Sequence, residues 1–136
     1  MSEVLQIVRQ VLDSQPFSVL LGARISAVES KAISIELPVR AELLQQHGFV
    51  HGGVLSYLAD NALTFAGGLA LGSKIVTSEY KINYVRPAVG ELLVARAGVV
   101  YAGSRQAVCR CDVFVQQNGT EKLVATAQGT ISTQAD

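Results

Sequence analysis

Residues 53–71 form a run of small, aliphatic and aromatic side chains in which Asp60 is the only charged residue, and Gly72 follows directly. The run is long enough for about five helical turns, and glycine is common just past the end of a helix. A helix that is apolar on nearly every side has to be surrounded by other elements. The sequence therefore predicts a central helix enclosed by the rest of the chain.

This central helix is not expected to cross a membrane, because a span needs about 20 predominantly apolar residues and an aspartate at its centre is costly. Charged residues make up only 16% of the chain, against roughly 25% in typical soluble domains. The 11 basic and 11 acidic residues balance, so the basic surface of a nucleic-acid binder is not expected. We therefore expect the surplus apolar surface to be covered in an oligomer, with neither membrane nor nucleic acid as partner.

The remaining sequence predicts an α+β fold in one domain over residues 1–136. A short helix is expected over residues 3–14, where apolar residues recur at helical spacing until Pro16 stops it. Alternating apolar and polar residues predict strands, and Asn118-Gly119 predicts a two-residue hairpin turn. The strands are expected over residues 17–27, 32–39, 75–85, 91–101, 105–117 and 122–133, with a short helical segment over 41–46. Strict alternation places Val76, Ser78, Tyr80, Ile82 and Tyr84 on one face of their strand.

Cys109 and Cys111 are the only cysteines and are separated by a single residue. They have no distant partner for a disulfide, and two thiols alone are too few for a zinc site. The first residues lack the basic and apolar regions of a signal peptide. We therefore expect reduced thiols on a strand, and a cytoplasmic protein.

A narrow polar stripe interrupts the central helix. Ser56, Asp60 and Thr64 are spaced at i, i+4 and i+8, with Tyr57 and Asn61 beside them. Such stripes are usually solvent-facing edges, but those normally carry Lys, Glu or Arg, which this helix lacks. A short acid among aliphatic residues is expected to be partly desolvated, as functional acids often are. We therefore favour Asp60 as a functional residue.

The turn that precedes the helix is rich in glycine. Gly52 and Gly53 place unhindered amides at a helix N-terminus, where they can bind an anion or polarise a carbonyl oxygen. For Gly48 we favour a purely conformational role in a turn with positive φ. Gly52 and Asp60 are eight residues apart, about 12 Å of helical rise, which is too far for both to contact one reacting carbonyl. If they cooperate, they come from two different chains.

Other groups of polar residues give weaker signals. His47 and His51 are four residues apart, but the intervening glycines disfavour a helix and no third ligand follows, so we expect no metal site. Arg86 and the pair Ser104-Arg105 are candidate phosphate contacts, although exposed arginines are more often simply solvated.

Residues 45–53, Gln-Gln-His-Gly-Phe-Val-His-Gly-Gly, are followed by Leu58-Ala59-Asp60. This pattern resembles the PaaI-like hotdog thioesterases of the phenylacetate and hydroxybenzoyl-CoA type, whose signature is Asn or Gln, then G-x-x-H-G-G, then L-A-D or L-A-E. The resemblance implies the hotdog fold, a curved antiparallel β-sheet wrapped around one long α-helix. It also implies hydrolysis of acyl-CoA at a site shared by two subunits, usually in a dimer-of-dimers tetramer. No cofactor is expected, since CoA is part of the substrate.

The resemblance also assigns roles to individual positions. Asp60 corresponds to the catalytic carboxylate, and the Gly52 amide to the group that polarises the thioester carbonyl. The remaining implied catalytic positions are Gln45, which helps to hold the carbonyl or water, His51, near the thiolate leaving group, Thr64, which assists the carboxylate, and Thr77, which orients water. The implied substrate contacts are Gly53, Arg86, Ser104 and Arg105.

Two questions stay open at this stage. A glutamine combined with an aspartate mixes features of two subtypes, so Asp60 is either a nucleophile or a general base. The alternative function is a hotdog module that binds an acyl-CoA or acyl-carrier ligand without turning it over. The large residues Phe49, Tyr57, Phe65 and Leu69 fit an acyl pocket and the core equally well, so the acyl specificity is left undetermined.

Overall fold

A computed structural model describes residues 2–134 and contains the expected long central helix, α3 (Gly52–Leu71). Residues 1, 135 and 136 of the predicted domain lie outside the described part. The helix begins after His51, which has non-helical backbone angles and caps the first turn with its side chain. It ends at Gly72, whose φ is +96°. The buried face of α3 consists of Val54, Leu55, Leu58, Ala59, Ala62, Leu63, Ala66 and Gly67.

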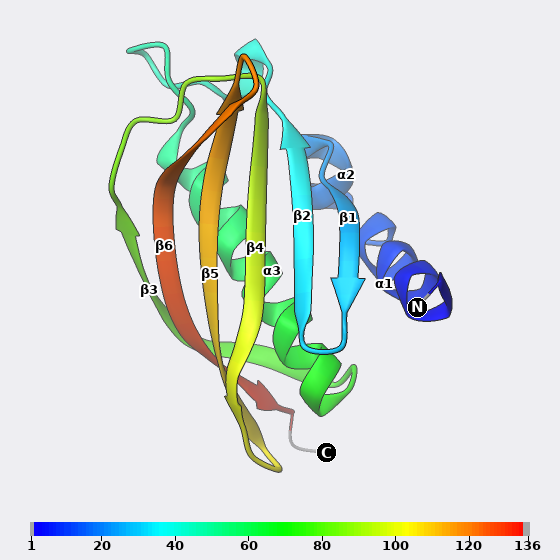
Figure 1. Cartoon of the computed structure of the whole chain (residues 1–136). Helices are drawn as coiled ribbons and strands as arrows, with labels where there is room; N and C mark the ends of the chain where they lie inside the picture. Colours follow the sequence, from blue (N-terminus) through cyan, green and yellow to red (C-terminus); the bar gives the residue numbers. More distant parts are fainter. Residues whose placement is uncertain (1, 135–136) are drawn as a thin grey trace.

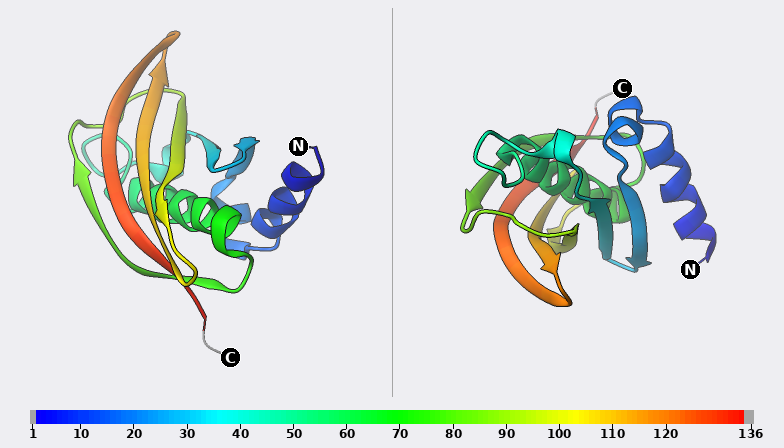
Figure 2. Two further views of the ribbon diagram at one scale, coloured as in Figure 1. Left: turned by 60° about the horizontal axis from the view of Figure 1, so that its bottom comes forward. Right: turned by 90° about the horizontal axis from the view of Figure 1, so that it is seen from above.

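Six antiparallel strands form one curved sheet that partly encloses α3 (Figures 1 and 2). The strand order is β1-β2-β4-β5-β6-β3, so that β1 and β3 form the two edges. Asn118 and Gly119 have φ of 52° and 80°, the left-handed angles that the predicted hairpin turn between β5 and β6 requires. The strands are β1 (Arg24–Glu29), β2 (Ala32–Pro38), β3 (Ile75–Tyr84), β4 (Leu92–Ala102), β5 (Gln106–Gln117) and β6 (Thr120–Thr133).

The core lies between α3 and the concave face of the sheet. Its largest fully buried side chains include Leu58 and Leu63 of α3, Ile35 and Leu37 of β2, and Ile131 of β6. By length and hydropathy α3 would also qualify as a membrane span, but it packs against strands β2 to β6. The predicted enclosure explains its composition: it is the core helix of this fold.

The prediction of a strand over residues 17–27 is wrong in its first half. A short helix, α2 (Pro16–Leu21), precedes β1. Proline at the first helical position lacks an amide that would be unpaired there anyway, and Gly22 with φ of +89° ends the helix. The Arg40 guanidinium then donates hydrogen bonds of 2.6 and 2.7 Å to the last two carbonyls of α2. The proline at its start, and Gly22 and Arg40 at its end, therefore stabilise this segment as a helix.

The other short segments are close to their predictions. Helix α1 (Ser2–Asp13) packs against β1. The helical segment expected over residues 41–46 is a single 3-10 turn, η1 (Ala41–Leu43), because the chain then pairs Leu44 with Val50 in an isolated β-bridge.

Strand β3 does not alternate strictly, so the prediction that its even-numbered residues 76–84 share one face is wrong. Thr77 pairs with Ile131 of β6, and Glu79 pairs with the adjacent Thr130, so a bulge lies between them. The bulge shifts the alternation by one residue. As a result Thr77 before it and Tyr80 after it are both half-buried on the inner side of the strand.

Candidate active site

Asp60 lies in the middle of α3, and its carboxylate faces β3. Thr77 of β3 donates a 2.8 Å hydrogen bond to Asp60 Oδ1. The Thr64 hydroxyl, one helical turn on, donates to the Asp60 backbone carbonyl at 2.8 Å and lies 2.8 Å from the Thr77 hydroxyl. Within residues 2–134, Oδ2 accepts no hydrogen bond. The half-buried carboxylate is thus fixed through one oxygen while the other is available.

The predicted polar stripe of α3 is divided between two neighbours. Ser56 contacts the Tyr80 hydroxyl, so it faces β3 like Asp60 and Thr64. Tyr57 and Asn61 instead hydrogen-bond to Ser18 of α2, which is 1% exposed. The first set borders the site, and the second fastens α2 to the central helix.

The N-terminus of α3 presents one free amide. The Gly53 amide donates to His51 Nδ1 at 2.8 Å, so this amide is occupied by the cap. A side chain at residue 53 would place its Cβ 2.9 Å from that nitrogen, which explains the glycine. His51 therefore carries its proton on Nε2 when neutral, an assignment that follows from the hydrogen bond. In the described part of the chain the Gly52 amide has no acceptor, as expected for the first amide of a helix.

Gln45 lies in the closed loop that leads to this helix. Its backbone amide donates to the Phe49 carbonyl at 2.9 Å, and its Oε1 accepts from the His47 amide. Gly48 has φ of +88°, which confirms the predicted conformational role of this glycine. Among residues 2–134 the Gln45 Nε2 group donates no hydrogen bond.

The two ends of β3 separate the predicted site residues into two groups. Thr77, near the start of the strand, binds Asp60. Tyr84, at its end, packs beside Gly52, with 3.5 Å between its ring and the position of a Cβ at residue 52. Because two turns of α3 lie between Asp60 and Gly52, a single chain does not bring them to one reacting carbonyl. The sequence placed Tyr84 on this strand but gave no sign that its ring lies beside Gly52.

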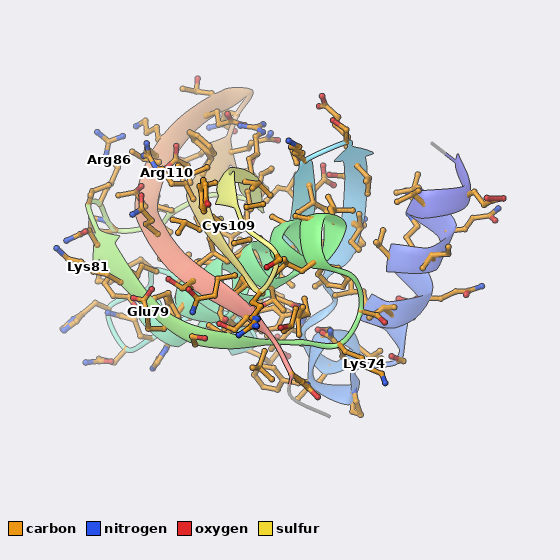
Figure 3. All side chains as sticks on the ribbon, turned by 90° about the horizontal axis from the view of Figure 1, so that it is seen from below. Lys74, Glu79, Lys81, Arg86, Cys109 and Arg110 are labelled. Carbon is orange, nitrogen blue, oxygen red and sulfur yellow. The ribbon has the colours of Figure 1, made fainter. Side chains whose placement is uncertain are left out.

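The candidate phosphate contacts also lie at opposite ends of β3. Arg86 follows the end of β3 and, together with Lys81, lies on the side of the molecule where β3 forms the sheet edge (Figure 3). The Arg105 carbonyl accepts from Thr133, which pairs with Ile75 at the start of β3. Over these ten residues a strand extends about 33 Å. Arg86 and Ser104-Arg105 therefore form no joint cluster within one chain.

The predicted acyl-pocket residues lie in different places. Phe65 and Leu69 line a cavity of about 490 Å³ between α1 and α3, whereas Phe49 lines one of about 330 Å³ beside Gly52. Tyr57 packs edge-to-face on Phe17, with ring centroids 5.3 Å apart.

Catalysis by a cysteine nucleophile or by a bound metal ion has less support in the structure. Cys109 and Cys111 are buried on the inner face of β5, and burial raises the pKa of their thiols to about 11 and about 12. Since the thiolate is the nucleophile, neither cysteine is reactive near neutral pH. Among residues 2–134 no three His, Cys, Asp or Glu side chains form a group that could hold a metal ion.

One long helix packed against a curved antiparallel sheet is the arrangement of the hotdog fold, and the solved structures agree. A thioesterase family protein from Silicibacter pomeroyi superposes with a TM-score of 0.91 at 32% identity, covering 96% of this chain and 98% of the other. The Escherichia coli PaaI protein superposes with a TM-score of 0.84 at 26% identity, covering 96% of this chain and 92% of the other.

The sequence comparisons give the family. Residues 47–122 match the family model of the thioesterase superfamily. A relative from Archaeoglobus fulgidus is 34% identical over 113 residues, which are 82% of this chain and 71% of that protein. The acyl-coenzyme A thioesterase PaaI of E. coli is 32% identical over 104 residues, 76% of this chain and 74% of its own. The chain belongs to the thioesterase superfamily and is a thioester hydrolase.

Proposed function

We propose that this enzyme hydrolyses acyl-CoA thioesters to the free acid and CoA in the cytoplasm, at a site shared between two subunits. The observation that carries the proposal is how the Asp60 carboxylate is held. Asp60 is the one charged residue of the central helix, fixed through Oδ1 by Thr77 and with Oδ2 available. The similarity to the E. coli acyl-CoA thioesterase supports CoA esters as the substrate class.

Asp60 can act in two ways that this geometry supports equally. As a nucleophile, Oδ2 attacks the thioester carbonyl, the C–S bond breaks, and water hydrolyses the resulting mixed anhydride. As a general base, Oδ2 takes a proton from the water that attacks the carbonyl, and the C–S bond then breaks. In either route the Gly52 amide donates to the carbonyl oxygen as negative charge develops there, and the thiolate departs near His51 Nε2–H.

Pairing of two β3 strands would join the separated halves of the site. β3 is an unpaired edge of the sheet, and long exposed edges are usually covered. An antiparallel pair about a two-fold axis would set the Thr77 half of one strand against the Tyr84 half of the other. Asp60 and Arg105 of one subunit would then approach Gly52 and Arg86 of its partner.

Exposed apolar side chains support two subunit contacts. On and after β3, Val76, Tyr84 and Val85 are 45%, 53% and 53% exposed, which fits a contact along this edge. A second group lies on α2, where Phe17, Val19 and Leu20 are exposed. We propose that the edge forms the homodimer and that α2 contributes to a dimer of dimers.

Release of free CoA thiol from acetyl-, butyryl-, octanoyl-, decanoyl- and phenylacetyl-CoA tests the activity. The wild type is expected to hydrolyse at least one of them, and Asp60→Asn to lower kcat/KM by about 10²–10⁴-fold, the usual contribution of a positioned base. Asp112→Asn is the matched control, because Asp112 is also half-buried and accepts a threonine hydroxyl, from Thr126 at 2.7 Å, but lies on β5 outside the site.

The outcomes separate the competing functions. Full activity of Asp60→Asn would refute the role of this carboxylate. A wild type that binds these CoA esters but releases no thiol from any of them would instead identify a binding module.

A further inference from the structure

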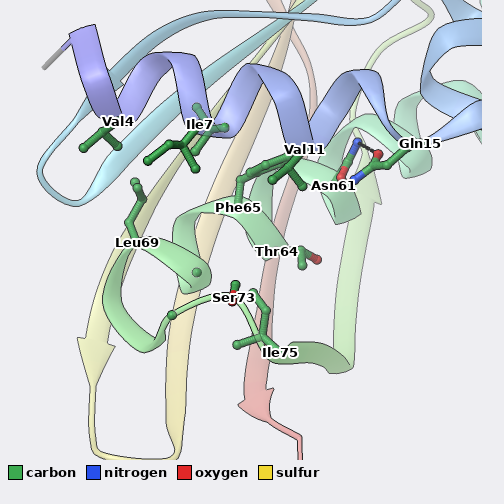
Figure 4. A pocket seen from close by; sticks show the side chains of 13 residues that line it. Val4, Ile7, Val11, Gln15, Asn61, Thr64, Phe65, Leu69, Ser73 and Ile75 are labelled. Carbon is green, nitrogen blue, oxygen red and sulfur yellow. Dashed lines mark hydrogen bonds between the residues drawn. The ribbon is translucent and has the colours of Figure 1, made fainter.

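The cavity between α1 and α3 is almost entirely apolar along one wall and polar at one end. It has a volume of about 490 Å³ and is lined by residues of both helices, by Gln15, Gly72 and Ser73 of the adjoining turns, and by the first residue of β3. Gln15 and Asn61 are hydrogen-bonded to each other at its polar end, with Thr64 nearby (Figure 4). Val4 and Leu69 lie at the opposite, apolar end (Figure 4).

Helix α1 has more apolar surface than its packing requires. Val8 and Leu12 are 8% and 1% exposed and belong to the core. A second stripe, Val4, Ile7 and Val11 at i, i+3 and i+7, lines the cavity and is 40%, 56% and 45% exposed. A helix that only covers β1 needs one such stripe. The second stripe therefore leaves an apolar surface of α1 that faces the cavity.

The cavity adjoins the proposed catalytic carboxylate. Thr64 lines it, and the Thr64 hydroxyl lies 3.5 Å from Asp60 Oδ1. On the α3 side the lining continues from Thr64 through Phe65, Gly68 and Leu69 to Gly72. Glycine at position 68 keeps the cavity open, because a side chain there would project beside Ile75, with its Cβ 3.2 Å from Cδ1.

We propose that this cavity holds the acyl chain of the substrate and selects chains of medium length. The inference rests on the proposed function and specifies its substrate class. From Thr64 to Gly72 the helix rises about 12 Å. An extended protein backbone spans about 3.6 Å per residue, which contains three bonds. An extended acyl chain therefore also advances about 1.2 Å per bond. The cavity therefore accommodates about eight to ten carbons.

Chain-length dependence of the wild type is the first measurement. Burial of each added methylene is expected to raise kcat/KM by about fourfold, from butyryl-CoA up to octanoyl- or decanoyl-CoA. Beyond decanoyl-CoA the gain is expected to stop. A profile that is flat from butyryl- to decanoyl-CoA in an active enzyme would overturn the inference while leaving the proposed function intact.

Ile7→Trp fills the middle of the cavity from a position that is already half-exposed, so the fold is expected to tolerate it. The ratio of kcat/KM for decanoyl-CoA to that for butyryl-CoA is expected to fall at least tenfold. Gln6→Trp adds the same side chain at an exposed position of α1 that does not line the cavity, and is expected to keep the wild-type ratio. An unchanged ratio in Ile7→Trp would contradict the proposal.

Binding of S-decyl-CoA, a thioether that cannot be hydrolysed, tests the chain-binding cavity independently of catalysis. It is expected to bind the wild type at least tenfold more tightly than S-butyl-CoA, and this preference is expected to disappear in Ile7→Trp but not in Gln6→Trp. If no ester is hydrolysed but this pattern appears, the proposed function fails and the chain-binding cavity stands. If Ile7→Trp changes only the sedimentation coefficient, the stripe is a contact with a second copy and the proposal is wrong.

Discussion

At the scale of single residues, the two carboxylate oxygens of Asp60 differ: Oδ1 accepts the hydrogen bond from Thr77, and Oδ2 is the oxygen that we propose reacts. Thr77 donates to Oδ1 from the sheet, and Thr64 fixes the backbone of the same residue from within the helix. A carboxylate held in this way keeps Oδ2 in one direction, which is what a nucleophile or a base needs in order to meet a carbonyl or a water.

The hydroxyl of Thr77 is the part of this arrangement that can be removed most cleanly. Thr77→Val has nearly the same shape but no donor. We therefore expect kcat to fall about 10- to 100-fold with little change in KM, the cost of one hydrogen bond to a charged group. Thr77→Ser keeps the donor and is expected to retain most of the activity. Steady-state kinetics of both variants test this. If kcat falls equally in Thr77→Val and Thr77→Ser, the effect comes from packing and not from the hydroxyl.

The residues of the site differ in how far the sequence could reveal them. Spacing alone indicated Asp60 and Thr64, because few charged or hydroxyl residues interrupt an apolar helix. It could not separate Asn61 from them, since adjacent helical positions point about 100° apart and can meet different neighbours. Thr77 was expected only through the family resemblance, because its side chain reaches Asp60 from another element.

At the scale of elements, the two errors of prediction have the same origin. The six residues from Pro16 are too few for hydrophobic periodicity to distinguish a helix from a strand. The conformation is determined instead by the proline and Gly22 at the two ends of the segment. The bulge at residues 77–79 of β3 leaves no periodic signal either. Both features depend on local backbone geometry, whereas the long strands and α3 follow from repeated patterns.

Close approach of α3 to β6 depends on Gly67. A Cβ at this position would lie 2.6 Å from Ile131 Cβ, so Gly67→Ala is expected to lower the free energy of unfolding by about 1–3 kcal/mol, as overpacking does. Gly68→Ala meets only the flexible end of Ile75 and gains up to about 1 kcal/mol of helix propensity. Urea denaturation of the two variants measures the difference, and equal midpoints would show that Gly67 is not a packing requirement.

At the scale of the whole molecule, the low charge content has a structural explanation. Part of the apolar excess lies in α3 and the concave face of the sheet, as the sequence predicted. Much of the remainder is exposed on α1, on α2 and along the β3 edge. Composition alone shows that there is a surplus of apolar residues, but it does not show where on the surface they lie. The proposed dimer would cover the edge and complete the site in one step.

A variant that removes only the Gly52 amide is available from the backbone geometry. His51 has φ of −59° and ψ of 135°, the conformation that a residue before proline prefers. Position 52 is the first of the helix, where proline is well tolerated. Gly52→Pro is therefore expected to fold normally and, alone, to lose most activity.

Subunit complementation tests the shared site most directly. Asp60→Asn and Gly52→Pro, each nearly inactive, are unfolded together in equimolar amounts, refolded, and assayed for thiol release. If Asp60 and Gly52 act across a two-fold interface, half of the dimers are mixed and each has one intact site, so about one quarter of the wild-type activity is expected. Activity that stays at the average of the two separate variants would contradict a site shared between subunits.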